Sequence, residues 1–396
     1  MSSNNNLPPG KIRNIESDKA AEAVGRHSAG VVATKYISFA APPNVLQLTS
    51  GRNLGPVTIA YETYGTLNSA KSNAILVCHA LSGDAHAAGF HEGETVPGWW
   101  NDMIGPGKAL DTNLYFVICS NVIGGCKGST GPSSVNPGNG KPYAMDFPVI
   151  TIEDMVTAER YLIDFLGIEK LLCVIGGSFG GMQALQWASK YPDRIVAAIP
   201  IATALKHSPQ QIAFDEVIRQ TIMADPAWRD GNYYDYGQPE KGLAVARMIG
   251  HITFMSDQSM EDKFSRKLKN GNLSFRFIDD FEVEGYLRYR GYNFVKRFDA
   301  NSYLYITKAM DYFDLSGENF MPGIKKTDIR FLVISFKSDW LYPSHQSQDI
   351  VRLLKRKHAY ATYFDLSSTY GHDAFLIEIE DETRLIKNFL ANISQN

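Results

Sequence analysis

The chain has 396 residues, and its 39 Lys and Arg nearly balance its 42 Asp and Glu, which leaves a formal net charge of −3. This composition offers no basic stripe for nucleic acid and no acidic tail, and no apolar run reaches the roughly 18 residues of a membrane span. We therefore expect a soluble globular chain with neither nucleic-acid nor membrane partners. The first six residues, MSSNNN, lack the charged start and apolar core of a secretion signal, which predicts a cytoplasmic location.

The four cysteines, Cys78, Cys119, Cys126 and Cys173, show no C-x-x-C spacing. Cys78 and Cys173 fall within predicted buried strands, where a thiol behaves as a small hydrophobic group, so we expect no disulfide framework. No pair of histidines lies four residues apart beside a glutamate, as a helical zinc motif would require. The sequence therefore predicts no metal site.

The first part of the chain alternates between predicted strands and helices. Residues 1–40 are polar and small, with a short helix expected at 18–24, and they predict a flexible lead-in. A core domain is expected over 41–203. Within this domain, apolar or β-rich runs predict four strands. Apolar residues at helical spacing predict one helix, which precedes the fourth strand. The strands are 57–64, 74–78, 114–119 and 171–175, and the helix is 152–166. This order is typical of a mostly parallel sheet with helices on both faces.

Residues 176–180, GGSFG, follow the strand at 171–175 and precede a predicted helix at 182–190. A serine on such a sharp turn projects its hydroxyl above the sheet edge, and the flanking glycines leave room for the crossing helix. G-x-S-x-G alone carries little weight in a chain with 33 glycines. The strand before it and the helix after it make Ser178 the predicted nucleophile of an α/β-hydrolase fold.

In this fold the acid and the histidine of the triad follow the serine, on loops after two later strands. The predicted strand at 329–336 runs into a loop that contains Asp339, and the strand at 359–364 precedes a loop that contains His372. His345 comes too soon after Asp339, and His358 ends a basic run that reads as a solvated helix terminus. We therefore predict a triad of Ser178, Asp339 and His372.

Acyl transfer also needs backbone N–H donors for the developing oxyanion. One is usually the amide after the nucleophile, which here belongs to Phe179, and the other comes from the loop after an early strand. The loop after strand 74–78 makes Leu81 the predicted second donor.

From 204 to 321 the strand rhythm gives way to amphipathic stretches at 210–224, 242–256 and 303–312. These predict a helical lid inserted over the sheet edge, with the core resuming over 322–396. Such a lid would cover Ser178 and restrict water. Six lid tyrosines are candidates to line it, although packing within the lid is their simpler role: Tyr233, Tyr234, Tyr236, Tyr286, Tyr289 and Tyr292.

Arg247 is the only formal charge between 242 and 256, in an apolar setting. An unpaired arginine there is costly, so it requires a partner or a cavity. A guanidinium suits a carboxylate held by two hydrogen bonds. The residues alone leave two alternatives, a substrate carboxylate or an internal Asp or Glu.

Several motifs with no general meaning for hydrolases occur in order, and with them the chain resembles the homoserine O-acetyltransferase family over residues 45–390. They are 61–65 (YETYG), 79–86 (HALSGDAH), 98–100 (GWW), 121–129 (NVIGGCKGS), 177–184 (GSFGGMQA), 246–253 (ARMIGHIT), 338–341 (SDWL) and 371–376 (GHDAFL). Phe179 stands where relatives commonly have methionine, and residues 1–40 lie outside the shared region.

The resemblance implies a two-step transfer with acetyl-CoA as co-substrate and no bound cofactor. Ser178 would take the acetyl group with His372 as base, and L-homoserine would then accept it through its side-chain hydroxyl, giving a methionine precursor. The resemblance also implies that Arg247 binds the homoserine carboxylate, that Asp373 binds its amino group, and that the chain forms a homodimer through the lid helices.

Three alternatives stay open on the sequence. Related enzymes use succinyl-CoA or accept serine, and a succinyl group would need a further cation, for which Arg219, Lys206 and Lys127 are candidates. A carboxylic-ester hydrolase of the same fold would not depend on Arg247. A binding module without activity would have little need of all three triad residues.

Overall fold

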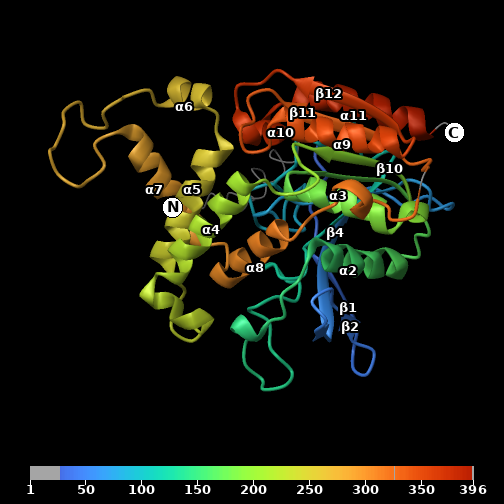
Figure 1. Cartoon of the computed structure of the whole chain (residues 1–396), viewed down its shortest axis with the longest axis horizontal. Helices are drawn as coiled ribbons and strands as arrows, with labels where there is room; N and C mark the ends of the chain where they lie inside the picture. Colours follow the sequence, from blue (N-terminus) through green and yellow to red (C-terminus); the bar gives the residue numbers. More distant parts are fainter. Residues whose placement is uncertain (1–26, 325, 395–396) are drawn as a thin grey trace, which may run out of the picture.

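The computed structural model describes residues 27–324 and 326–394, and the helix expected at 18–24 lies outside them. An eight-stranded sheet forms the centre, in the order β1-β4-β8-β5-β9-β10-β11-β12 (Figure 1). Its strands are β1 (Lys35–Phe39), β4 (Val57–Tyr64), β5 (Ala74–Cys78), β8 (Phe116–Ser120), β9 (Leu171–Gly177), β10 (Ile195–Ile201), β11 (Arg330–Phe336) and β12 (Tyr360–Leu366).

The sheet is mostly parallel, as predicted. The neighbours from β8 to β12 all pair in parallel, whereas β4 runs antiparallel to β1 and β8. Strand β5 is buried along its whole length, and its side chains alternate between two cores. Leu76 packs into the core on one face, and Ile75 and Val77 pack into the core on the other. Burial on both faces explains the continuous apolar runs of these strands.

Helices cover both faces of the sheet. On one face lie α2 (Ile152–Phe165), α3 (Phe179–Lys190) and α9 (Ser344–Arg356), and on the other α11 (Ile379–Ser394) follows the short α10 (Ala374–Ile377). Helix α2 begins with a capping box, in which the Thr151 side chain accepts the Asp154 N–H and the Asp154 carboxylate accepts the Thr151 N–H. The prediction of an α/β-hydrolase fold is therefore confirmed.

The prediction of a flexible lead-in over residues 1–40 is wrong for residues 35–39, which form strand β1. Strand β1 pairs antiparallel with β4, with Lys35 opposite Tyr61 and Phe39 opposite Val57. Only Ile37 of this edge strand is buried. Backbone pairing, rather than burial of side chains, therefore adds the strand to the sheet, and this leaves little hydrophobic signal in the sequence.

Between β10 and β11 the chain forms the helices of the predicted lid. They are α4 (Pro209–Met223), α5 (Glu240–Phe254), α6 (Asp257–Lys263), α7 (Glu282–Val295) and α8 (Ala300–Asp311). Figure 1 shows α4 to α7 as a body beside the sheet, with α8 between that body and the core. The predicted stretches at 210–224, 242–256 and 303–312 correspond to α4, α5 and α8. Tyr236, Tyr289 and Tyr292 are exposed, so they do not line a covered site.

Short elements complete the described chain. Two small sheets pair β2 (Leu46–Gln47) with β3 (Asn53–Leu54) and β6 (Ile104–Gly105) with β7 (Leu110–Asp111), and 3-10 turns occur at Ala144–Asp146, Pro192–Arg194, Pro226–Gly231, Gly317–Asn319 and Gly371–Asp373. Within 27–324 and 326–394, no helix combines the length and the apolar character that crossing a membrane requires.

Candidate active site

Ser178 stands on a strained turn between β9 and α3. Its backbone has φ 57° and ψ −121°, a conformation that residues other than glycine rarely adopt. The Ser178 N–H donates to the carbonyl of Ile201 at 2.9 Å, which ties the turn to the end of β10. Strand, turn and helix therefore hold the serine at the carboxyl edge of the sheet, as a nucleophile elbow requires.

The glycines of the elbow permit close packing that any side chain would prevent. A Cβ atom on Gly180 would lie 2.1 Å from the Cys78 carbonyl oxygen, and one on Gly176 would lie 2.6 Å from the backbone of Gly180. One on Gly177 would meet the Phe375 ring at 2.4 Å. The elbow consequently touches the end of β5, which brings the loop after that strand beside Ser178.

The predicted acid and base meet in a buried pair. The His372 Nδ1–H donates to Asp339 Oδ2 at 2.7 Å, and both side chains are almost fully buried. Asp339 Oδ1 accepts the backbone N–H groups of Leu341 at 3.0 Å and Tyr342 at 2.8 Å. These bonds fix the carboxylate, and with Nδ1 occupied the Nε2 of His372 is left as the basic nitrogen.

One cavity brings most of the predicted site residues together. It is lined by Ala80, Leu81, Ser82, Ser178, His207, Gln211, Phe214, Asp215, Ile218, Arg247, Gly250, Thr253, Phe254, Tyr303, Met310, Leu341, Tyr342, His372, Asp373, Phe375 and Leu376. Asp339 lies behind His372, and Phe179 supplies the first backbone amide of α3 with its side chain fully buried. The rival histidines His345 and His358 do not line this cavity.

The loop that carries Leu81 is held at its base by His79. The His79 Nδ1–H donates to the Ala80 carbonyl at 2.8 Å, and Nε2 accepts the Val122 N–H at 3.2 Å. Burial lowers the pKa of His79, so the ring is neutral and can accept. Gln183 of α3 also donates to the His79 carbonyl at 3.2 Å, which links this loop to the helix that follows Ser178.

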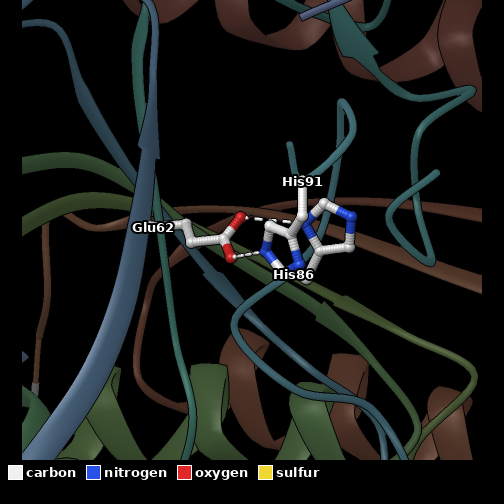
Figure 2. A group of neighbouring side chains, drawn as sticks. All are labelled: Glu62, His86 and His91. Atoms are coloured by element: carbon white, nitrogen blue, oxygen red, sulfur yellow. Dashed lines mark hydrogen bonds and ion pairs between the residues drawn. The ribbon is translucent and has the colours of Figure 1, made fainter. Parts of the chain in front are cut away.

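Farther along, the same loop is anchored to β4 by Glu62, whose carboxylate faces two histidines (Figure 2). Glu62 accepts hydrogen bonds from His91 Nε2 at 2.7 Å and His86 Nδ1 at 3.0 Å. The hydroxyls of Thr34 and Tyr64 also donate to it, each at 2.9 Å. Burial alone would raise the pKa of Glu62, but the bonds from His86, His91 and Thr34 outweigh it and lower the pKa to about 2.

We expect Glu62→Gln to lower the free energy of unfolding at pH 7 by about 3 kcal/mol, because it leaves the partly buried His86 and His91 without the charged acceptor that the fully buried Glu62 supplies. Since the Glu62 pKa is lowered on folding, its contribution is present above the ordinary carboxyl pKa of 4.5 and lost as the pH falls toward 2. Urea denaturation from pH 7 downward measures both effects. Glu153→Gln, which breaks a partly exposed pair with Lys190, should cost less than about 1 kcal/mol. Equal losses in the two variants would contradict this role.

Arg247 projects from α5 into the cavity. Its guanidinium donates to Ser82 Oγ at 3.3 Å and stacks over Phe294 and Phe254, with 4.7 and 5.4 Å from Cζ to the ring centroids. Within the described part of the chain, no carboxylate lies within 4 Å of it. Burial lowers the pKa of Arg247 to about 10, which still leaves it charged at neutral pH. No internal acid among the described residues therefore forms a direct ion pair with Arg247, although the charge of Asp373 in the same cavity acts on it.

Asp373 follows His372 in the chain and lines the same cavity. Burial raises its pKa, and the charges of His372 and Arg247 only partly offset this effect. A bound ammonium group would lower the pKa again and favour the carboxylate. The cavity that contains Ser178 thus also contains the Arg247 guanidinium and the Asp373 carboxyl group, which form no direct ion pair with each other.

The sequence reasoning missed a buried polar cluster that also borders the cavity. Tyr342 donates to, or accepts from, His207 Nε2 at 2.7 Å, and His207 Nδ1 lies 3.3 Å from Asp311 Oδ1 and 3.4 Å from Asp215 Oδ2. Arg219 pairs with Asp311 at 2.7 Å. Two members gave a sequence signal, since Tyr342 stands three residues after Asp339 in the same loop and Arg219 was a candidate cation, but neither signal predicted the cluster.

Two groups among the described residues bring three possible metal ligands within 4.8 Å of one another: Glu62, His86 and His91, and His207, Asp215 and Asp311. In the first, protein donors already engage both carboxylate oxygens. In the second, the Arg219 guanidinium supplies a positive charge beside the carboxylates. Hydrogen bonds and ion pairs therefore account for both clusters.

The fold defines an α/β-hydrolase-type protein, and the site places Ser178 where this fold carries its nucleophile. A family model for the alpha/beta hydrolase fold matches residues 73–378, and the chain belongs to that family. The chain is 59% identical to homoserine O-acetyltransferase of Methanohalobium evestigatum over 92% of its length and 74% of the relative, and 52% identical to that of Deferribacter desulfuricans over 93% and 97%. Within the fold family, it is a member of the homoserine O-acetyltransferases.

Solved structures agree. Homoserine O-acetyltransferase from Bacillus anthracis superposes with a TM-score of 0.84 at 32% identity, covering 91% of this chain and 98% of that one. Esterase E22 superposes with a TM-score of 0.82 at 31% identity, over 91% and 100%. Because a transferase and an esterase fit almost equally well, the fold alone does not distinguish the two reactions.

Proposed function

We propose that this chain transfers an acetyl group from acetyl-CoA to the side-chain hydroxyl of L-homoserine, as a step of methionine biosynthesis. The products are O-acetyl-L-homoserine and CoA. The observation that carries this proposal is the presence of Arg247 and Asp373 in one cavity with Ser178 and His372. A plain ester hydrolase has no need of such a pair of charges, whereas an amino-acid acceptor does.

The chemistry follows a ping-pong course. His372 Nε2 takes the Ser178 proton as Oγ attacks the thioester carbonyl, and the Leu81 and Phe179 amides hold the oxyanion. The C–S bond then breaks, and the CoA sulfur leaves with the proton from His372. In the second half, His372 takes the proton of the homoserine hydroxyl, whose oxygen attacks acetyl-Ser178. The bond from the acetyl carbon to Ser178 Oγ breaks, and the proton returns to the serine.

Acetyl is favoured over succinyl because the candidate cations do not line the cavity. Arg219 pairs with Asp311 and Glu216, and Lys206 lies 3.9 Å from Asp314 at the surface. Lys127 borders a separate surface hollow with Lys296 and Arg297. A succinyl carboxylate would therefore compete with homoserine for Arg247.

Thiol release with acetyl-CoA or succinyl-CoA, each with and without L-homoserine, tests the proposal. We expect multiple turnovers only with homoserine present and at least 10-fold faster release from acetyl-CoA. Equal release without homoserine would indicate a hydrolase, and faster release from succinyl-CoA would change the donor. L-Serine in place of homoserine tests the shorter acceptor.

We also propose a homodimer through the lid. Helices α5 and α7 expose Val245, Ile252, Tyr289 and Tyr292, and Phe277 in the connection before α7 is fully exposed. Large exposed apolar side chains on two helices that pack together favour an association surface there. Light scattering at micromolar concentration should give twice the chain mass, and a monomer mass would remove this proposal. The predicted cytoplasmic location stays a prediction.

A further inference from the structure

Tyr342 is a further polar side chain beside the predicted triad. Tyr342 lies in the loop after β11, and its ring packs against His372 with 5.0 Å between centroids. The side chain is buried, lines the cavity with Ser178, and has its hydroxyl within hydrogen-bonding reach of the serine hydroxyl. Burial raises the pKa of Tyr342 well above its usual value, so the phenol stays protonated.

The Tyr342 hydroxyl is held from behind by His207, at 2.7 Å from Nε2. The other nitrogen of His207 faces Asp215 from α4 and Asp311 from α8. Arg219, one turn after Asp215, pairs with Asp311. All four residues of this group are buried or nearly so. Two carboxylates balanced by Arg219 and a protonated His207 make the cluster electrically neutral.

The position of the protons sets the direction of the chain of bonds. Burial opposes charge on His207, but its bonds to Asp215 and Asp311 outweigh burial and raise its pKa. Burial also raises the pKa of Asp215. If the proton between His207 and Asp215 resides on the imidazole, both ring nitrogens carry a hydrogen. If it resides on Asp215, the carboxyl group donates to Nδ1 and the ring hydrogen is on Nε2. Nε2 of His207 carries a hydrogen in both cases. His207 therefore donates to the Tyr342 oxygen, and the Tyr342 proton must point elsewhere.

We propose that Tyr342 is a further catalytic residue, which donates a hydrogen bond to Ser178 Oγ, and that His207 is the positioning residue that orients this donor. The inference rests on the proposed role of Ser178 as nucleophile. Ser178 Oγ gives its own proton to His372 while accepting the bond from Tyr342, so no proton leaves the tyrosine. The bond stabilises negative charge on Oγ when the oxygen attacks the thioester and again when it departs from acetyl-Ser178.

The rate at which a fluorophosphonate probe labels Ser178 measures this effect without acetyl-CoA or homoserine. In that reaction the P–O bond to Oγ forms, fluoride leaves and His372 takes the serine proton. We expect Tyr342→Phe to be labelled roughly 10- to 100-fold more slowly than the parent chain at pH 7. Tyr305→Phe is the matched control, since it removes a buried hydroxyl that donates to the Phe147 carbonyl and does not line the cavity, and should be labelled at the parent rate.

A pH series separates a chemical role from a structural one. The bonds to Asp215 and Asp311 raise the pKa of His207, so its donor arrangement is present at low pH and is lost as the pH rises through the raised pKa. Above it, a neutral His207 with its hydrogen on Nδ1 accepts from Tyr342 and withdraws the donor from Ser178. Labelling of the parent should thus decline on the alkaline side. His207→Gln should be slower at pH 7 and lack this decline, while both variants keep the same probe stoichiometry.

Parent-rate labelling of Tyr342→Phe would overturn the inference while leaving Ser178 as the nucleophile. If Tyr342→Phe does not fold, His207→Gln decides: an alkaline decline identical to that of the parent would overturn the role of the cluster. Failure of the probe to label Ser178 in the parent chain would instead remove the proposed function itself. Mass spectrometry of the labelled peptide shows whether the probe is on Ser178, and its extent over time gives the labelling rate.

Discussion

Ser178→Ala is expected to lower kcat for acyl transfer by about a million-fold, because loss of the nucleophile removes the covalent route entirely. The remaining amides and cavity still bind the substrates but have no atom to carry the acetyl group. The structure supports this with the strained turn at Ser178 and the buried pair of His372 and Asp339. Steady-state thiol release from acetyl-CoA in the presence of homoserine measures the effect.

Ser189→Ala is the matched control for this change. Ser189 lies near the other end of α3, and its buried hydroxyl accepts the Met321 N–H. The Ser189→Ala variant therefore measures the effect of removing a buried serine hydroxyl from the same helix. We expect this control to keep its kcat within about two-fold. Residual turnover of more than about one per cent in Ser178→Ala, in protein free of contamination, would contradict the nucleophile assignment.

Arg247→Leu is expected to lower kcat/KM for L-homoserine by roughly 100- to 1000-fold, as the loss of a buried charge contact costs about 3–4 kcal/mol. The physical reason is that the substrate carboxylate would enter the cavity without a cation to meet it. Acetylation of Ser178 by acetyl-CoA should change by less than about three-fold, because that half-reaction needs no amino acid. Stopped-flow thiol release without homoserine and steady-state rates with it separate the two steps.

The control for Arg247→Leu is Arg288→Leu. Arg288 is an exposed arginine of lid helix α7 whose partner is Asp279 at 3.4 Å, so its loss removes a lid charge outside the cavity. It should leave both half-reactions unchanged. Equal loss of the two half-reactions in Arg247→Leu would indicate a structural role for the arginine, and an unchanged kcat/KM would remove it from the acceptor site.

The core and the positions of the three candidate triad residues were predictable because their signals are local. Strand β5 is apolar in every residue since it is buried on both faces, and β9 runs directly into the glycines and Ser178. Asp339 and His372 then follow from the order of the later strands. Contact between them required no further information, because the carboxyl ends of parallel strands meet at one edge of the sheet.

Other features depend on contacts between distant segments, which no short pattern records. Glu62 meets His86 and His91 across more than 20 residues, and His207 meets Tyr342 across 135. The sequence around Arg247 likewise could not decide between an internal acid and a cavity, since that depends on what the neighbouring helices place beside it. Edge strand β1 escaped prediction because its pairing with β4 buries only Ile37.

The most direct test of the account is to follow the acetyl group on the protein. Brief mixing with acetyl-CoA, acid quench and peptide mass spectrometry should find acetyl on Ser178, and a chase with L-homoserine should remove it far faster than buffer alone, with O-acetyl-L-homoserine formed in equal amount. Acetyl on another residue, or an acetyl-Ser178 that buffer clears as fast as homoserine does, would contradict acyl transfer to an amino acid at this site.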